Sequence, residues 1–340
     1  MNTHRGAVLV TGGLGCIGSW TVRALLVAGI PTVAFDSGDD TRRLRSIAPD
    51  SLFANVRLVK GDLTDLHAVE TAVADNGVDR IVHLAALQLP FCRMDPPHGA
   101  LVNVVGTANV FEAARRAGIR QIAYTSSLAI FDRHTGRIDT GALPLPATHY
   151  GVYKLSNEGT ARAYWEEFGV TSIGIRPMTV YGPGRDRGLT SSPSRAILAG
   201  FLGCRYEIGF GGRTLFHYAG DVATALVAAV QAAVAGAHVV NLNGVSAPVT
   251  DIVTSLRRIV GTAADGITVA ADALPFPDDA ETAGLEIIGP PPVTPLHDGV
   301  AATVDFFRDL DREGRLDPGD HGLTVENRVA GDIETAGSTA

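Results

Sequence analysis

Tyr150 and Lys154 are the two residues whose types and spacing best suit a proton transfer. Four residues apart in a predicted helix, their side chains lie on one face, one turn apart. A free tyrosine titrates at about pH 10, and an ammonium group beside it favours the phenolate, which can exchange a proton with a carbinol. Ser127 follows a predicted strand and could donate a hydrogen bond to a developing oxyanion. Taken alone, a Tyr and a Lys at this spacing are more often one face of an amphipathic helix.

Spaced glycines near the start of the chain predict a dinucleotide site. An apolar run over 6–11 leads into Gly12, Gly15 and Gly18, and apolar residues at helical spacing follow. Gly12 would allow a tight turn, Gly15 the approach of backbone to a pyrophosphate, and Gly18 the packing of helix on strand.

Asp36 ends the second predicted strand and indicates which dinucleotide binds. Its carboxylate is placed to accept hydrogen bonds from the adenosine ribose and to repel a 2′-phosphate, which favours NAD over NADP. The alternative is a helix N-cap or a solvated loop acid. Arg42 and Arg43 lie nearby and could soften the rejection of NADP, but we expect them on an exposed helix.

Strands and helices alternate up to about residue 176. Strands are predicted at 6–11, 32–36, 56–60, 80–84, 121–125 and 171–176, and helices at 66–75, 101–117 and 150–168. Such alternation predicts an α/β protein with a Rossmann-type doubly wound parallel sheet, whose ligands bind outside the carboxyl ends of the strands. All the residues singled out above lie at such ends.

Beyond Pro177 the alternation loosens, which predicts a second, smaller unit. We expect an NAD-binding domain over 1–176, with returns near 219–243 that include a helix from 221 to 235. A discontinuous substrate-binding lobe would take about 177–218 and 244–316. The polar segment 318–340 is predicted to be a disordered tail.

Composition limits the class of partner. The chain has 340 residues, 46% of them hydrophobic, and a net charge of -8 without a basic patch, which argues against nucleic acid or a membrane as partner. We expect no apolar run to span a bilayer and no signal peptide before the first strand. Three scattered cysteines predict free thiols and a cytoplasmic protein, and the histidines show no metal-binding spacing.

These features together resemble the extended short-chain dehydrogenases/reductases of the NAD-dependent epimerase/dehydratase family, up to about residue 316. Further matches are Gly61-Asp62-Leu63, His83-Leu84-Ala85-Ala86, Asn103 with Gly106-Thr107, Thr125-Ser126-Ser127, Arg176-Pro177 with Val180-Tyr181-Gly182-Pro183, and Phe216-His217 with Asp221-Val222-Ala223.

The resemblance implies roles for individual residues. Ser127, Tyr150 and Lys154 would be the catalytic trio. The cofactor site would comprise Gly12, Gly15, Cys16, Ile17, Gly18, Asp36, Asp62, Leu63, Leu84, Ala85, Ala86, Asn103, Thr125, Tyr150, Lys154 and Pro177.

Departures from the family pattern concern the substrate. Leu128 and Ala129 replace the Asp-Glu pair of the dehydratases, which argues against water elimination. Thr179 stands where nucleotide-sugar members usually carry asparagine, and 272–289 lacks any Lys or Arg, whereas Arg213 matches a phosphate-gripping arginine. The candidate substrate residues are Gln88, Arg93, Ser127, Thr179, Arg185, Arg187 and Arg213.

Three functions stay open at this point. The first is an epimerase of a sugar or nucleotide sugar, working through a transient ketone; the second is a net dehydrogenase or reductase of a smaller polyhydroxylated substrate, such as a free sugar, sugar acid or carbocycle. The third is a non-catalytic NAD sensor, which would have no use for Ser127, Tyr150 and Lys154. A homodimer built through a pair of helices is the expected assembly.

Overall fold

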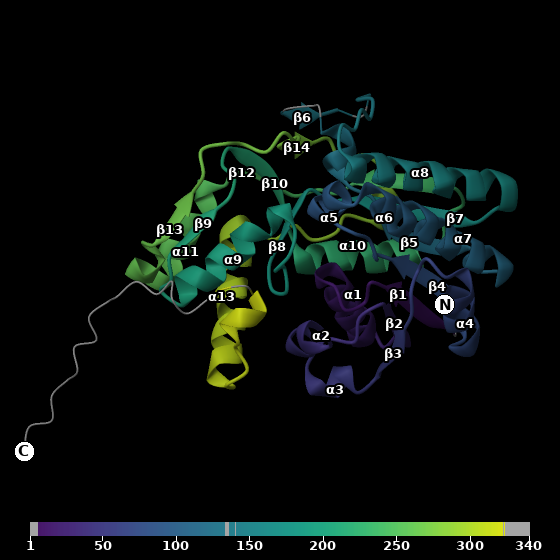
Figure 1. Cartoon of the computed structure of the whole chain (residues 1–340), viewed down its shortest axis with the longest axis horizontal. Helices are drawn as coiled ribbons and strands as arrows, with labels where there is room; N and C mark the ends of the chain where they lie inside the picture. Colours follow the sequence, from purple (N-terminus) through teal and green to yellow (C-terminus); the bar gives the residue numbers. More distant parts are fainter. Residues whose placement is uncertain (1–5, 133–135, 140, 322, 324–340) are drawn as a thin grey trace, which may run out of the picture.

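The computed structural model describes residues 6–132, 136–139, 141–321 and 323, and is built around a seven-stranded parallel sheet (Figure 1). The strand order is β11-β7-β5-β4-β1-β2-β3. In this order the strands are Ala237–Asn241, Thr171–Arg176, Gln121–Thr125, Val78–His83, Ala7–Thr11, Thr32–Asp36 and Val56–Lys60. The predicted α/β class and the six predicted strands are confirmed, with β4 beginning two residues early.

Alternate residues of β1 supply the two faces of the sheet. Val8 and Val10 pack into a core with α1 (Cys16–Val27) and α10 (Ala219–Gln231). Leu9 points the other way, into a core with α4 (Leu66–Asp75), α7 (Gly106–Arg116) and α8 (His149–Phe168). Because successive side chains of a strand point to opposite faces, an unbroken apolar strand of this kind needs helices on both sides.

The strand order reverses between β1 and β4, and this position determines where a ligand can bind. From β1 the chain proceeds to β2 and β3 on one side, and then returns to β4, β5 and β7 on the other. The loops after β1 and β4 therefore diverge and leave a crevice at the carboxyl edge of the sheet. The glycine turn over 12–18 lies in this crevice.

A smaller lobe packs beside this edge. Its three-stranded sheet has the order β12-β10-β8, with strands Val245–Pro248, Arg213–Tyr218 and Thr179–Tyr181. Helices α9 (Ser192–Phe201), α11 (Thr250–Val260) and α13 (Leu296–Arg312) enclose a separate hydrophobic core. The remaining named segments are α2 Arg42–Ile47, α3 Asp50–Phe53, α5 Leu89–Met94, α6 Pro96–Ala100, β6 Arg137–Ile138, β9 Tyr206–Ile208, β13 Ile267–Val269, β14 Asp279–Ala280 and α12 Leu285–Ile288.

Three sequence predictions differ from the structure. The helix expected over 101–117 begins with a five-residue π turn, Leu101–Val105, before α7. Helix α10 stops at Gln231, not at 235, because Ala232 is already extended and leads the chain toward β11. Residues Pro318–His321, expected in the tail, form a 3₁₀ helix. The rest of the predicted tail, apart from Leu323, lies outside the described residues.

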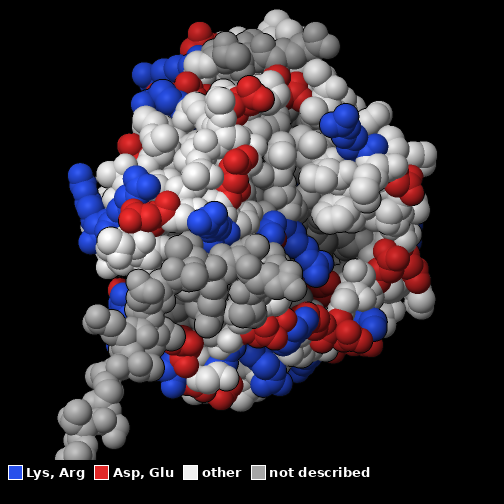
Figure 2. Space-filling view, turned by 60° about the vertical axis from the view of Figure 1, so that its left-hand side comes forward, with Lys and Arg blue, Asp and Glu red and all other residues white. Residues whose placement is uncertain are grey.

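Charge on the surface is mixed in sign. Figure 2 shows acidic and basic side chains interspersed over the face that it draws, without a broad basic field among the described residues. In the described part of the chain no helix is both long enough and apolar enough to cross a membrane.

Candidate active site

A cavity of about 670 Å³ lies at the carboxyl ends of the strands, between the sheet and the lobe. Its floor comes from the loops after β1, β2, β3, β4, β5 and β7. The lobe side contributes Met178, the segment 185–190 and Phe276. A cavity of this form, mostly apolar with a few polar groups, is typical of a site for a cofactor and a small molecule.

The glycine turn has the shape that a pyrophosphate requires. Gly12 has φ +68°, and a Cβ there would lie 2.8 Å from the Cα of Ala85. A Cβ on Gly18 would clash with the carbonyl oxygen of Gly12. Gly15 has ordinary backbone angles and lines the cavity as the N-cap of α1, so its missing side chain leaves space at a helix N-terminus. These residues fit a bound dinucleotide.

Asp36 lies at the edge of the same cavity. One carboxylate oxygen accepts a hydrogen bond from the amide of Leu14 at 3.1 Å, and the other from the amide of Gly38 at 3.1 Å. These bonds fix the carboxylate next to the glycine turn. Each oxygen keeps a lone pair with which it could accept a hydrogen bond from a ribose hydroxyl.

Ser127, Tyr150 and Lys154 all line the cavity. The Lys154 Nζ donates to the carbonyl oxygen of Thr125 at 2.7 Å and lies 5.7 Å from the centroid of the Tyr150 ring. Ser127 Oγ accepts from the amide of Ala129 at 3.1 Å, so the serine proton can be donated to Tyr150 or to a bound substrate. Thr148, the N-cap of α8, fixes the start of the helix that carries both Tyr150 and Lys154.

Burial shifts the titration of both groups toward their neutral forms. The pKa of Tyr150 is raised to about 12 by burial, against the opposing effects of the Arg185 charge and of a hydrogen bond with Ser127. The pKa of Lys154 is lowered to about 8, also by burial. Without a further positive charge the tyrosine therefore stays protonated near neutral pH. A nicotinamide cation would supply that charge.

His83, at the end of β4, connects the floor of the cavity to the helices behind it. Its Nδ1 lies 2.7 Å from Thr11 Oγ1, and its Nε2 lies 2.9 Å from Thr107 Oγ1. Thr107 already donates to the carbonyl of Asn103 at 2.7 Å, so it must accept from His83. The ring is therefore neutral with its proton on Nε2, and Thr11 donates to Nδ1.

A clasp of four residues, Trp20, Arg43, Pro183 and Asp186, joins the lobe to the glycine turn. Arg43 donates to both carboxylate oxygens of Asp186, at 2.8 and 2.6 Å, and to the carbonyl of Leu14 at 2.6 Å. The Trp20 indole donates to the carbonyl of Pro183 at 3.0 Å. Arg43, expected on an exposed helix, is thus a cavity residue with only 21% of its side chain exposed.

Most of the predicted site residues line the cavity, and four do not. Asn103 lies behind it and exchanges hydrogen bonds with the backbone of Leu87 at 2.7 and 2.9 Å. Arg93 is exposed on α5. Thr179 is buried, and Arg213 is exposed and donates to the carbonyl of Ser246. The sequence reasoning missed Arg43, Asp186, His98, Thr190 and Phe276, none of which carries a motif.

Comparison with known proteins agrees with this geometry. The model of the family described as "NAD dependent epimerase/dehydratase family" matches residues 8–243. A UDP-glucose 4-epimerase of Mycolicibacterium smegmatis is 32% identical over 88% of this chain and 98% of its own length.

Solved structures show the same likeness. MoeE5, in complex with UDP-glucose and NAD, superposes with a TM-score of 0.75 at 27% identity, over 89% of this chain and 99% of that one. The Thermus thermophilus UDP-glucose 4-epimerase, in complex with NAD, gives 0.73 at 25% identity, over 89% and 99%.

The chain belongs to the NAD dependent epimerase/dehydratase family. As a member of this family it is an NAD-dependent enzyme of the extended short-chain dehydrogenase/reductase type. Within the NAD dependent epimerase/dehydratase family, its cavity departs from the dehydratases in one respect: Leu128 is fully buried and Ala129 lines the cavity, where dehydratases carry an acidic pair. Neither side chain can protonate a leaving hydroxyl.

Proposed function

We propose that the protein is an epimerase that oxidises a secondary alcohol of a sugar-type substrate to a transient ketone and reduces it again from the other face. Bound NAD supplies the acceptor and donor of hydride for the two half-reactions. The observation that carries the proposal is the meeting of Ser127, Tyr150 and Lys154 in the same cavity as the glycine turn.

The three side chains have separate roles in moving the proton and stabilising the charge that develops. Tyr150 takes the proton of the substrate hydroxyl during oxidation and returns one during reduction. Lys154, held by the Thr125 carbonyl beneath the tyrosine ring, keeps a positive charge near the phenolate. Ser127 Oγ accepts from the Ala129 amide and its hydroxyl also bonds with Tyr150, so its proton can turn from Tyr150 to the substrate oxygen as negative charge develops there.

The clasp favours an epimerase over a net dehydrogenase. An epimerase regenerates its cofactor in every cycle and gains from retaining it, whereas a dehydrogenase must release the reduced cofactor. The pair of Arg43 with Asp186 closes the lobe over the glycine turn by two charge-assisted hydrogen bonds. Release of the cofactor between the lobe and the glycine turn would require breaking this partly buried ion pair.

Mass spectrometry of the denatured protein tests the proposal. We expect the purified protein to release NAD, and turnover of an identified substrate to proceed without accumulation of NADH. One equivalent of NADH formed per substrate consumed would establish the dehydrogenase instead.

We further propose a cytoplasmic homodimer. The described cysteines Cys16, Cys92 and Cys204 are all free, which fits a reducing compartment. The dimer would form through α8 and the π turn beside it, where Leu101, Val105 and Val152 are 43 to 47% exposed.

A further inference from the structure

The two lobe positions that the family pattern links to a diphosphate, Thr179 and Arg213, offer no positive charge to the cavity. Thr179, at the position where nucleotide-sugar members usually carry asparagine, lies 2.7 Å from Thr214, oxygen to oxygen. Both side chains are buried, and neither lines the cavity. Because neighbouring residues of a strand point to opposite faces, Thr214 points inward and Arg213 outward, to the carbonyl of Ser246 at 2.9 Å.

Arg185 is a cavity cation with unused hydrogen-bonding capacity. One of its terminal nitrogens donates to Thr190 Oγ1 at 3.1 Å, and its buried Nε has no hydrogen-bond partner among the described residues. The adjacent carboxylate, Asp186, is engaged with both oxygens on Arg43. A partly desolvated guanidinium without a carboxylate is costly, and an anionic ligand would remove that cost.

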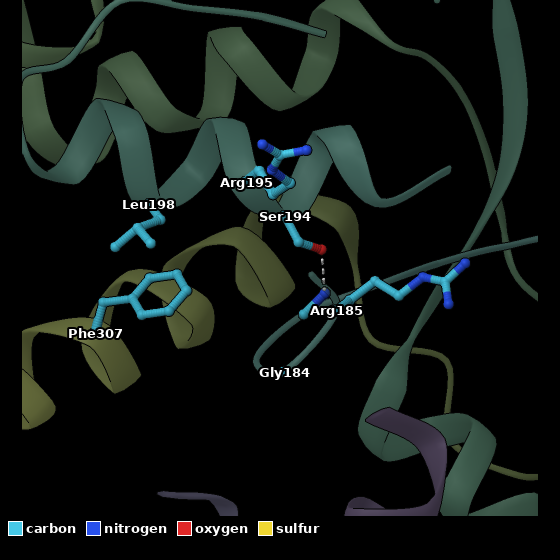
Figure 3. A pocket seen from close by; sticks show the side chains of 7 residues that line it. Gly184, Arg185, Ser194, Arg195, Leu198 and Phe307 are labelled. Carbon is cyan, nitrogen blue, oxygen red and sulfur yellow. Dashed lines mark hydrogen bonds between the residues drawn. The ribbon is translucent and has the colours of Figure 1, made fainter. Parts of the chain in front are cut away.

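The guanidinium of Arg185 lies on the catalytic side of the lobe. Figure 3 shows it extending away from Leu198 and Phe307, which belong to the core of the lobe. Arg185 lines the same cavity as Tyr150 and Cys16, and its positive charge opposes the rise that burial causes in the pKa of both residues. An anion bound by Arg185 would therefore occupy the same cavity as the proton-transfer group.

The side chain of Gln88 lies close to Arg185 in the cavity. Its buried side-chain oxygen has no hydrogen-bond partner among the described residues. Gly188, with φ +95°, lies between Gln88 and Arg185: a Cβ there would clash with the Gln88 oxygen and lie 3.4 Å from an Arg185 nitrogen. The glycine thus lets an amide and a guanidinium approach each other in the cavity, where they could bind a hydroxyl and an adjacent anion.

We propose that the substrate is a sugar acid without an attached nucleoside diphosphate, its carboxylate bound by Arg185 next to the carbinol that faces Tyr150. The proposal rests on the function proposed above and narrows its substrate class. A carboxylate suits a single planar guanidinium, which can hold it with two parallel hydrogen bonds. A phosphate monoester carries more charge, and the other deeply placed cations, Arg43 and Lys154, already have partners.

Ligand-induced shifts of the melting temperature of the NAD-loaded protein test this proposal. The probes are a panel of hexuronates and aldonates, the neutral sugars of the same stereochemistry, glucose 6-phosphate, and UDP. We expect at least one acid to raise the melting temperature, and the neutral sugars and UDP not to do so.

Arg185→Met should weaken the apparent affinity for that acid about 10- to 100-fold, the effect of losing a charge-assisted pair. Arg185→Lys should restore part of it, which also guards against a folding defect in the first variant. Arg213→Met, the matched control outside the cavity, should bind the acid like the native protein.

Stabilisation by UDP that Arg213→Met removes would overturn the proposal, as would a sugar phosphate that binds better than every acid. A panel in which no acid stabilises the protein would overturn it too. Because the measurement is of binding, it is independent of the reaction: accumulation of NADH from the bound acid would refute the epimerase and leave the carboxylate site standing.

Discussion

Tyr150 is the residue on which the proposed chemistry depends most directly. Tyr150→Phe keeps the ring that packs over Lys154 and removes the hydroxyl that exchanges the proton. We expect turnover to fall by about 100-fold or more while NAD stays bound. Steady-state kinetics together with the cofactor content of the purified variant measure the two effects separately. Full activity in the variant would require another proton-transfer group.

His83 makes the stability of the protein sensitive to acid. Burial, aided by the charge of Lys154, lowers the pKa of His83 from 6.5 to about 3 in the folded state. Between these values the unfolded chain binds the proton and the folded chain does not, so stability falls as the pH falls below about 6.5. Between pH 6.5 and pH 5, protonation of His83 in the unfolded chain should lower the free energy of unfolding by about 2 kcal/mol.

Denaturant titrations of the native protein and of His83→Gln at several pH values measure that contribution. The variant should be less stable at pH 7.5, because the glutamine cannot reproduce the bonds to Thr11 and Thr107. On acidification it should lose less stability than the native protein. Parallel losses in the two proteins would assign the acid sensitivity to other groups.

At the scale of elements, the clasp between α2 and the segment after β8 should control the exchange of the cofactor. Arg43→Met removes the pair with Asp186, whereas Arg42→Met, in the adjacent position, removes only exposed pairs with Asp40 and Asp320. We expect NAD to dissociate about 10- to 100-fold faster from the first variant and at the native rate from the second. Stopped-flow displacement of the bound cofactor measures both rates; equal rates would show that the clasp does not retain NAD.

Elements with a strong local pattern were predictable from the sequence. The apolar strands, the glycine turn and the pairing of Tyr150 with Lys154 depend on neighbours within a few residues, and the structure contains each of them. Helix α4 agrees with its predicted bounds, because Asp65 caps its start and a polar Asn76-Gly77 turn follows it.

Features that depend on distant residues were not predictable in this way. Arg43 and Asp186 are 143 positions apart, and no local pattern marks either as the partner of the other. The outward direction of Arg213 follows from the register of β10 against β12 and β8, which only the folded lobe establishes. Its position in the family motif suggested that Arg213 binds a phosphate, but the strand register directs its side chain away from the cavity.

At the scale of the whole molecule, the exposed apolar residues beside α8 predict the assembly. Replacing both Leu101 and Val152 with glutamate would place charge in the proposed interface, where it would have no partner. We expect the native chain of 35.5 kDa to sediment as a dimer and the double variant as a monomer that still binds NAD. Val27→Glu, at a residue 64% exposed on α1, is the control and should leave the dimer intact. A native monomer would exclude the proposed interface.

The late position of α10 and β11 in the chain has a consequence for synthesis on the ribosome. The strands from β1 to β7 emerge first, but the face formed by Val8 and Val10 is covered in part by α10, which follows much of the lobe. Until Gln231 has left the exit tunnel, the nascent sheet carries an apolar surface without its second helix layer. Incomplete chains that end near residue 176 would therefore be targets for chaperones and prone to aggregate, even though they contain the entire glycine turn and the catalytic trio.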